Sequence, residues 1–125
     1  MGYKGVLIVE DDRLRRHALE DAVRALKLTS TGLISTDNLS EAIAIIKNNR
    51  IECVIMGWDF PSGPQNFKIE ENGGELLQVV KKMGLKAVIC TNRAGQLTDE
   101  DLLGTPVIPP IPIGNLDERL AKCIA

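Results

Sequence analysis

The sequence lacks the residues that most metal and redox sites require. It contains one histidine, His17, and three cysteines, Cys53, Cys90 and Cys123, among 125 residues. The cysteines lie far apart, so neither a CxxC pair nor the spacing of zinc ligands occurs. Their odd number and wide separation predict small buried side chains with free thiols in a reducing compartment. We expect His17 to be an exposed residue on a helix.

The sequence also lacks a concentration of charge or of apolar residues. It carries 15 basic and 17 acidic residues, a net charge of −2, with the two signs intermingled. Without a basic stripe, nucleic-acid binding is not expected. No apolar run approaches the ~20 residues needed to cross a bilayer, and residues 1–5 have no signal-peptide core. We therefore expect a cytoplasmic protein that contacts no membrane.

Apolar periodicity alternates between strands and helices along the whole chain. Short apolar runs predict strands, and stripes with helical spacing predict helices after them. The predicted strands are 4–9, 33–35, 51–56, 86–91 and 106–108, and the predicted helices are 13–28, 38–46, 75–83, a short one from 98 and one from 115 to about 123. Five βα units predict a single domain, residues 1–125, built as a doubly wound three-layer α/β sandwich with a parallel sheet.

Acidic residues follow the first predicted strand. The carboxyl ends of parallel strands share one edge of a sheet, which is where such folds bind ligands. Clustered carboxylates like Glu10, Asp11 and Asp12 suit Mg²⁺. The same residues also suit the start of the next helix, where Asp12 would cap and the other two would lie near the positive helix end. The residues themselves leave both interpretations open.

Several segments, in order along the chain, resemble the receiver domains of two-component response regulators. Residues 6–12 are similar to the first strand and acidic pocket of that family, and residues 55–61 to its third strand and proline turn. Residues 73–77 resemble the start of its third helix. Thr91 and residues 109–111 fall where receivers place the switch hydroxyl and a lysine-proline pair. The resemblance implies a flavodoxin-like (βα)5 fold with strand order 2-1-3-4-5.

The residues that receivers use for phosphoryl transfer are replaced at two of these positions. Gly57 stands where the acceptor aspartate would stand, so the nucleophile is absent. Pro109 stands where the lysine would stand, so the cation is absent. The resemblance thus implies a vestigial pocket, with at most weak Mg²⁺ binding by its two acids. Its positions are Glu10, Asp11, Gly57, Thr91 and Pro109.

Three features near this pocket leave alternatives open. Asp59 is a substitute acceptor by its spacing from Gly57, although we expect it in the turn before Pro61. Trp58 packs in the core or over the crevice, or stacks on a ligand. Residues 62–72 are longer than the family's turn, which fits a mobile insertion, a folded flap or a partner-binding loop.

The stiff region around the fifth predicted strand adds one further expectation. Receivers commonly have a cis peptide bond after the lysine, so the bond preceding Pro110 is the candidate cis-proline here. The same region belongs to the output surface of receivers, formed by the fourth helix, fifth strand and fifth helix.

These observations predict a non-enzymatic, non-phosphorylatable receiver that acts in two-component phosphorelay signalling by binding protein. The expected partner is a histidine kinase, an output domain or a second copy of the chain. The alternative is a small-molecule- or metal-responsive domain that reuses the emptied crevice. An enzyme is not expected, because the sequence offers no nucleophile–base pair at the strand ends.

Overall fold

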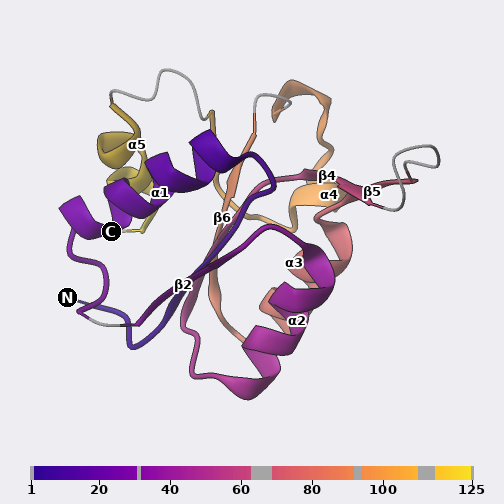
Figure 1. The fold of residues 1–125 in the computed structure, drawn as a ribbon. Coiled ribbons are helices and arrows are strands. Elements are labelled where there is room, and N and C mark those ends of the chain that lie inside the picture. Colours follow the sequence, from indigo (N-terminus) through magenta and orange to yellow (C-terminus); the bar gives the residue numbers. More distant parts are fainter. Residues whose placement is uncertain (1, 31, 63–68, 92–93, 110–114, 125) are drawn as a thin grey trace.

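A five-stranded parallel sheet forms the centre of the molecule (Figure 1). The computed structural model describes residues 2–30, 32–62, 69–91, 94–109 and 115–124. The sheet has the order β2-β1-β3-β6-β7. Its strands are β1 (Val6–Val9), β2 (Leu33–Thr36), β3 (Cys53–Met56), β6 (Lys86–Cys90) and β7 (Val107–Ile108). The predicted α/β class and parallel sheet are confirmed.

Helices cover both faces of this sheet (Figure 1). They are α1 (Arg13–Ala25), α2 (Leu39–Asn48), α3 (Gly74–Lys82), α4 (Asp99–Leu102) and α5 (Leu116–Ile124), with a short 3-10 turn, η1 (Ala94–Gln96). Helices α1 and α5 lie together on one face, and α2 and α3 pack on the other. Among the described helices, none is long and apolar enough to span a membrane.

The central strands are buried on both faces, which explains their continuous apolar sequence. Alternate side chains of each strand enter two separate hydrophobic clusters. Leu7 and Val54 point toward α2 and α3, whereas Ile8 and Ile55 point toward α1 and α5, and all four are fully buried. The sheet is therefore a rigid support for the residues that follow its strands.

The chain forms two strands that the sequence analysis did not predict. Strands β4 (Asp59–Ser62) and β5 (Ile69–Asn72) pair antiparallel as a small separate sheet. Because β4 and β5 come before the last two strands of the large sheet, those strands are the sixth and seventh of the chain. The order of the large sheet is β2-β1-β3-β6-β7, so the predicted order 2-1-3-4-5 is corrected. Asp59 begins a strand and does not lie in a turn. Residues 63–68 lie outside the described residues, so the alternatives for the 62–72 insertion remain untested there.

Helix α1 differs from its predicted apolar stripe and length. Leu14 is 70% exposed and Ala25 is also exposed, whereas Leu19 and Val23 are buried. The helix ends before residue 28 because Lys27 adopts a left-handed conformation with φ 54°. Of the predicted stripe of Leu14, Ala18, Ala22, Ala25 and Leu26, one member, Ala22, is buried.

The predicted helix ends are formed by local hydrogen bonds. The Asp12 carboxylate accepts from the backbone N–H groups of Leu14 and Arg15 at 2.9 and 3.1 Å. Asn38 caps α2 in the same way, accepting from the N–H of Glu41 at 2.8 Å. These bonds satisfy donors that a helix leaves unpaired at its first turn.

Replacing Asp12 with alanine is expected to lower the free energy of unfolding by about 1 kcal/mol, because two N–H groups lose their acceptor. Asp12→Asn keeps a side-chain oxygen at the cap and should lose clearly less. Urea denaturation of both variants measures the difference. Equal losses in the two variants would show that the side-chain oxygen at residue 12 does not stabilise the start of α1.

Candidate functional site

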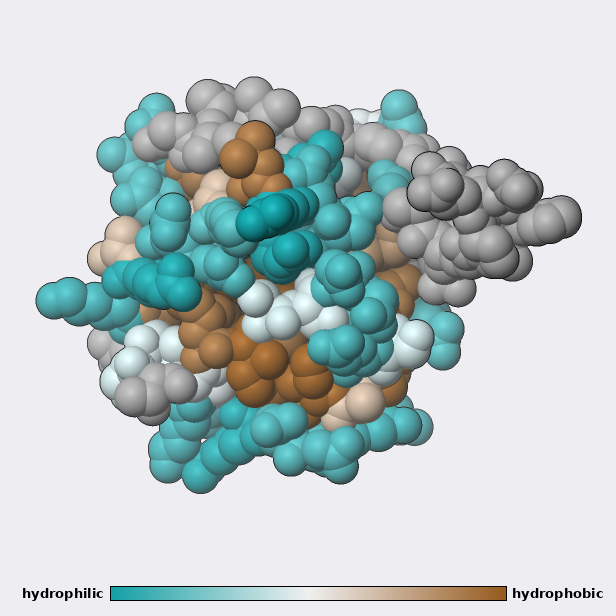
Figure 2. Space-filling view, viewed as in Figure 1, coloured by the Kyte–Doolittle hydropathy of each residue, from teal (hydrophilic) through white to brown (hydrophobic). Residues whose placement is uncertain are grey.

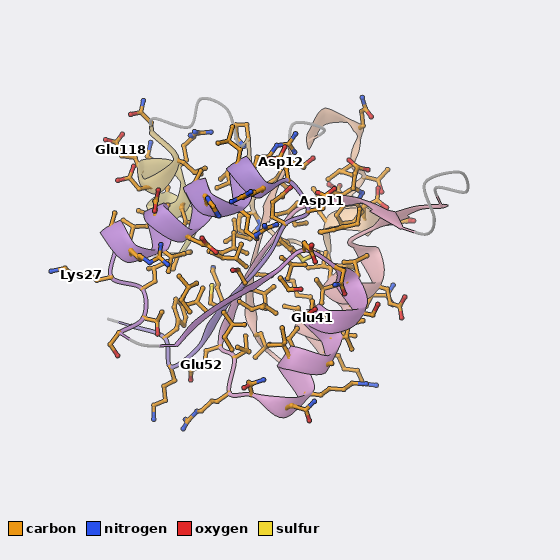
Figure 3. All side chains as sticks on the ribbon, viewed as in Figure 1. Asp11, Asp12, Lys27, Glu41, Glu52 and Glu118 are labelled. Carbon is orange, nitrogen blue, oxygen red and sulfur yellow. The ribbon has the colours of Figure 1, made fainter. Side chains whose placement is uncertain are left out.

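The predicted pocket residues meet at the carboxyl edge of the sheet. Glu10 follows β1, Gly57 follows the neighbouring β3, and the N–H of Gly57 donates to the carbonyl of Val9 at 2.8 Å. Thr91 follows β6 and donates its N–H to the carbonyl of Ile108 at 3.0 Å, next to Pro109. Figure 3 labels Asp11 and Asp12 where the chain leaves β1 and enters α1. These positions therefore follow strands of the large sheet, and their predicted roles stay predictions.

The space above Gly57 is filled by the side chain of Glu10. A Cβ atom at Gly57 would overlap Oε2 of Glu10 and lie 3.3 Å from its Cδ and 3.6 Å from Cζ of Phe60. Glu10 itself is 2% exposed. The carboxyl group thus occupies the place that an acceptor side chain at residue 57 would take. The crevice that the sequence analysis regarded as emptied is occupied by the chain itself.

The environment of Glu10 favours its neutral form. The pKa of this carboxyl is raised to about 7, and burial is the largest cause; a side-chain hydrogen bond and the charge of Asp11 act in the same direction. Two contacts act in the opposite direction. The N–H of Asp12 donates to Oε1 at 3.2 Å, and Nη1 of Arg15 lies 4.0 Å from the same oxygen. Glu10 and Asp11 are therefore two interacting acids at the end of β1, and their interaction favours the neutral form of Glu10.

This pair of acids fits Mg²⁺ poorly. Magnesium prefers several oxygen ligands in octahedral geometry and keeps water among them. Here one carboxyl group is buried against Gly57 and bonded to the other. Across the described ranges, no three His, Cys, Asp or Glu residues are grouped so that they could hold a metal ion. We therefore assign no chemical step to a metal at this site.

The position expected for a lysine offers a carbonyl oxygen and no charge. Pro109 is exposed, and its carbonyl accepts a hydrogen bond from Nη1 of Arg119 on α5. Arg119 also donates from Nε to the carbonyl of Asn115 at 3.3 Å. The guanidinium group is thus used to hold the start of α5 to the end of β7. The candidate cis-proline, Pro110, lies outside the described residues.

The remaining residues near the pocket have structural contacts. Trp58 is 6% exposed and belongs to the core cluster under α2 and α3, together with Phe60. Gly73 packs directly on this region, because a Cβ there would overlap Cε of Met56 and approach the carbonyl of Gly57 to 3.1 Å. Thr91 is 5% exposed and Asp59 is exposed. Core packing of Trp58 agrees with the first of its predicted alternatives.

The residues predicted to lie outside the site do so. His17 is an exposed residue of α1, and all three cysteines are free thiols. Burial raises the pKa of Cys53 and of Cys90 to about 12, so both remain protonated at neutral pH. Cys123 is half-buried on α5. None of these thiols has the lowered pKa of a reactive cysteine.

Solved structures that match this fold include response-regulator receiver domains. The chain matches the solution structure of SdrG from Sphingomonas melonis Fr1 with a TM-score of 0.67 and 21% identity over 98% of both chains. It matches a CheY-like response regulator receiver domain from Methylobacillus flagellatus with a TM-score of 0.69 and 16% identity over 98% of this chain and 99% of that one. This chain has the receiver fold.

A third receiver-fold match comes from a signalling complex. A chain in the co-crystal structure of Saccharomyces cerevisiae Ypd1, a histidine phosphotransfer protein, with the receiver domain of Ssk1 is 21% identical, with a TM-score of 0.67 over 98% of this chain and 87% of that one. No protein-family model and no curated protein matches the sequence. At these identities the likeness shows a shared fold, and function must be argued from the site.

Adding a methyl group at Gly57 is expected to destabilise the protein by about 1–3 kcal/mol, because the new Cβ overlaps the buried carboxyl of Glu10. The φ of Gly57 is not positive, so backbone strain does not contribute. The loss from Gly57→Ala should shrink in a Glu10→Ala background, which removes the overlapping atoms. Chemical denaturation of the four proteins gives the coupling energy. Gly95→Ala, where a Cβ meets no atom within 4 Å, is the control, and an equal loss in both backgrounds would contradict the overlap.

The raised pKa of Glu10 predicts a pH dependence of stability. Because the folded-state pKa of about 7 exceeds the ordinary value of 4.5, the folded state holds its proton longer, and stability falls as pH rises between these values. Glu10→Gln removes this loss, which is on the order of 3 kcal/mol when complete. The variant should therefore be more stable than wild type at pH 8 and similar at pH 4.

Thermal unfolding across this pH range measures the effect. The matched change Glu118→Gln, at an exposed position of α5, should leave the profile unchanged. If Glu10→Gln destabilised the protein equally at both pH values, Glu10 would not be a neutral buried acid.

Proposed function

We propose that this chain is a degenerate receiver domain that is not phosphorylated and regulates two-component signalling by binding other proteins. The observation that carries the proposal is the pairing of Gly57 with Glu10. Phosphoryl transfer to a receiver needs an ionised carboxylate that a phosphodonor can reach. Here the acceptor position has no side chain, and a buried carboxyl group with a raised pKa occupies its space.

The second support is the loss of positive charge beside that position. A transferred phosphoryl group requires cations that neutralise its oxygens. Pro109 provides none, and the nearby Arg119 donates to the carbonyls of Pro109 and Asn115. Arg15 lies at the mouth, but it is close to the carboxylates of Glu10 and Asp12, at 4.0 and 3.8 Å. The described cations near the strand ends are thus committed to contacts within the chain.

Protein binding is proposed because the chain keeps a receiver's surface without its chemistry. Helix α4 is four residues long, and Leu103, which follows it, is 44% exposed and has φ 49°. Leu97 and Val107 are half-buried and, like Leu102 of α4, pack against the core cluster under α2 and α3. This part of the surface, with α5, is the one we assign to a histidine kinase or an output domain. By analogy with the Ypd1–Ssk1 complex, a phosphotransfer protein belongs to the same class of partner.

The alternative of a ligand-responsive crevice has less support. It requires a cavity above Gly57, whereas the Glu10 carboxyl lies in that space. It also requires ligands from the acidic pair, of which Glu10 is buried and Asp11 is half-buried. We therefore prefer surface recognition to binding of a small molecule or metal.

Incubation with acetyl phosphate and Mg²⁺ tests the proposal. The purified chain should gain no phosphoryl group, measured by intact mass, under conditions in which a functional receiver does. A gain of one phosphoryl group would overturn the proposal. The variants Asp59→Asn and Glu10→Gln would then identify which carboxyl group serves as the acceptor.

A further inference from the structure

The two edges of the large sheet are protected to different degrees. Strand β7 is two residues long and lies between Pro106 and Pro109. Strand β2, at the opposite edge, is four residues long, Leu33–Thr36, and contains neither a charge nor a proline. Edge strands usually carry charges or prolines, or are very short, because their backbone groups otherwise pair with another chain. Strand β2 is thus the edge suited to accept a further strand.

The hydrogen bonds to β1 show which backbone groups of β2 face outward. The N–H groups of Val6 and Glu10 donate to the carbonyls of Gly32 and Thr36 at 2.9 and 3.0 Å. Backbone groups alternate between the two sides of a strand, so residues 32, 34 and 36 face β1. The N–H and C=O groups of Leu33 and Ser35 therefore point away from β1, along the outer edge of the sheet.

The side chains at this edge are apolar or already bonded. Leu33 and Ile34 are half-buried, and the hydroxyl of Ser35 donates to Oε2 of Glu20 on α1 at 2.6 Å. Figure 2 shows hydrophobic and near-neutral side chains gathered at the centre of this face, where β2 runs between α1 and α2 in Figure 1. A strand placed here would cover the apolar side chains of Leu33 and Ile34, and the carboxylate of Glu20 would keep its hydrogen bond from Ser35.

The charges around β2 are complementary under a two-fold rotation. Exposed Lys27 and Arg24 lie before the strand begins, whereas exposed Asp37 and Glu41 follow its end. Figure 3 shows Lys27 and Glu41 on opposite sides of this face. When a second β2 runs antiparallel, the basic end of each copy meets the acidic end of the other. Such self-complementarity is the property of an isologous dimer interface.

A cavity lies where the acidic end of a second copy would arrive. It has a volume of about 140 Å³ and is lined by Val23, Arg24, Thr29, Ser30 and Leu33. In an antiparallel arrangement, Asp37 of the second copy comes opposite the segment that precedes β2. The guanidinium group of Arg24, whose Nη1 also lies 3.6 Å from Oδ1 of exposed Asp21, and the hydroxyl groups of Thr29 and Ser30 are donors that a carboxylate requires there.

We propose that two copies of this chain form a two-fold dimer in which their β2 strands pair antiparallel, making one continuous sheet. In the symmetric register that satisfies the outward groups of both strands, Leu33 of each copy pairs with Ser35 of the other. Ile34 then lies opposite its own counterpart on the two-fold axis. The inference rests on the proposed protein-binding function and names a second copy as partner and β2 as the surface.

Sedimentation velocity of the full chain tests this dimer. We measure it from about 10 to about 500 µM, because pairing of four-residue strands makes a small interface that binds weakly. The sedimenting species should change from monomer to dimer. No larger species should form, because pairing leaves neither copy with a free β2 edge. Amide exchange should slow at Leu33 and Ser35 as concentration rises, and at Ile34 it should not change.

Charge reversal provides the matched variants. Asp37→Lys should weaken the dimer at least tenfold by placing like charges at both ends of the interface, and Asp37→Lys with Lys27→Asp should restore it. Glu100→Lys, the same change of charge at an exposed position of α4, should have no effect. Unchanged melting temperatures show that each variant is folded.

Three outcomes would overturn the dimer. They are a monomer at all concentrations, association that Glu100→Lys weakens and Asp37→Lys does not, and open-ended assembly. Any of these would leave the phosphodonor result unaffected, so failure of the dimer and failure of the proposed function are separate findings.

Discussion

The site depends on one steric constraint, the contact between the carboxyl group of Glu10 and the bare backbone of Gly57. These residues follow adjacent parallel strands, so their positions are fixed by the β1–β3 pairing. A side chain at residue 57 would overlap the carboxyl group, and a shorter residue at 10 would leave a hole beside Phe60. The buried position of the Glu10 carboxyl group therefore requires a glycine at residue 57, and the space above Gly57 is filled only when residue 10 has a long side chain. The bare backbone at residue 57 and the filled crevice are two aspects of the same packing arrangement.

This arrangement changes the charge at the sheet edge as well as its shape. Burial of Glu10 and its hydrogen bond with Asp11 raise its pKa to about 7, so the two acids together carry less negative charge than two ionised carboxylates would. A pocket with less negative charge has less need of a nearby cation. Pro109 at the lysine position and the engagement of Arg119 with backbone carbonyls agree with that electrostatic balance.

The sequence predicted the parts of the structure that depend on local patterns. Continuous apolar runs located the buried strands, and Asp12, Asn38 and Thr98 marked helix starts because capping is a contact between near neighbours. The β4–β5 hairpin was missed because its first strand contains Asp59 and Pro61, which are typical of turns. The filled crevice was missed for a different reason. A glycine in a sequence indicates only a missing side chain, and the group that fills its space comes from a residue 47 positions earlier.

The order of the strands gives the two proposed surfaces different places. Strand β2 and strand β7 are the opposite edges of the same sheet. Antiparallel pairing of two β2 strands would therefore leave α4 and β7 of each copy accessible at the far ends of the joined sheet. A dimer of this kind would present two equal surfaces to a partner, and a dimeric partner that engaged both would bind more tightly than either contact allows. The β7 edge, which lies between two prolines, would then take part in recognition of other proteins. The β2 edge, which has neither a charge nor a proline to prevent strand pairing, would take part in self-association.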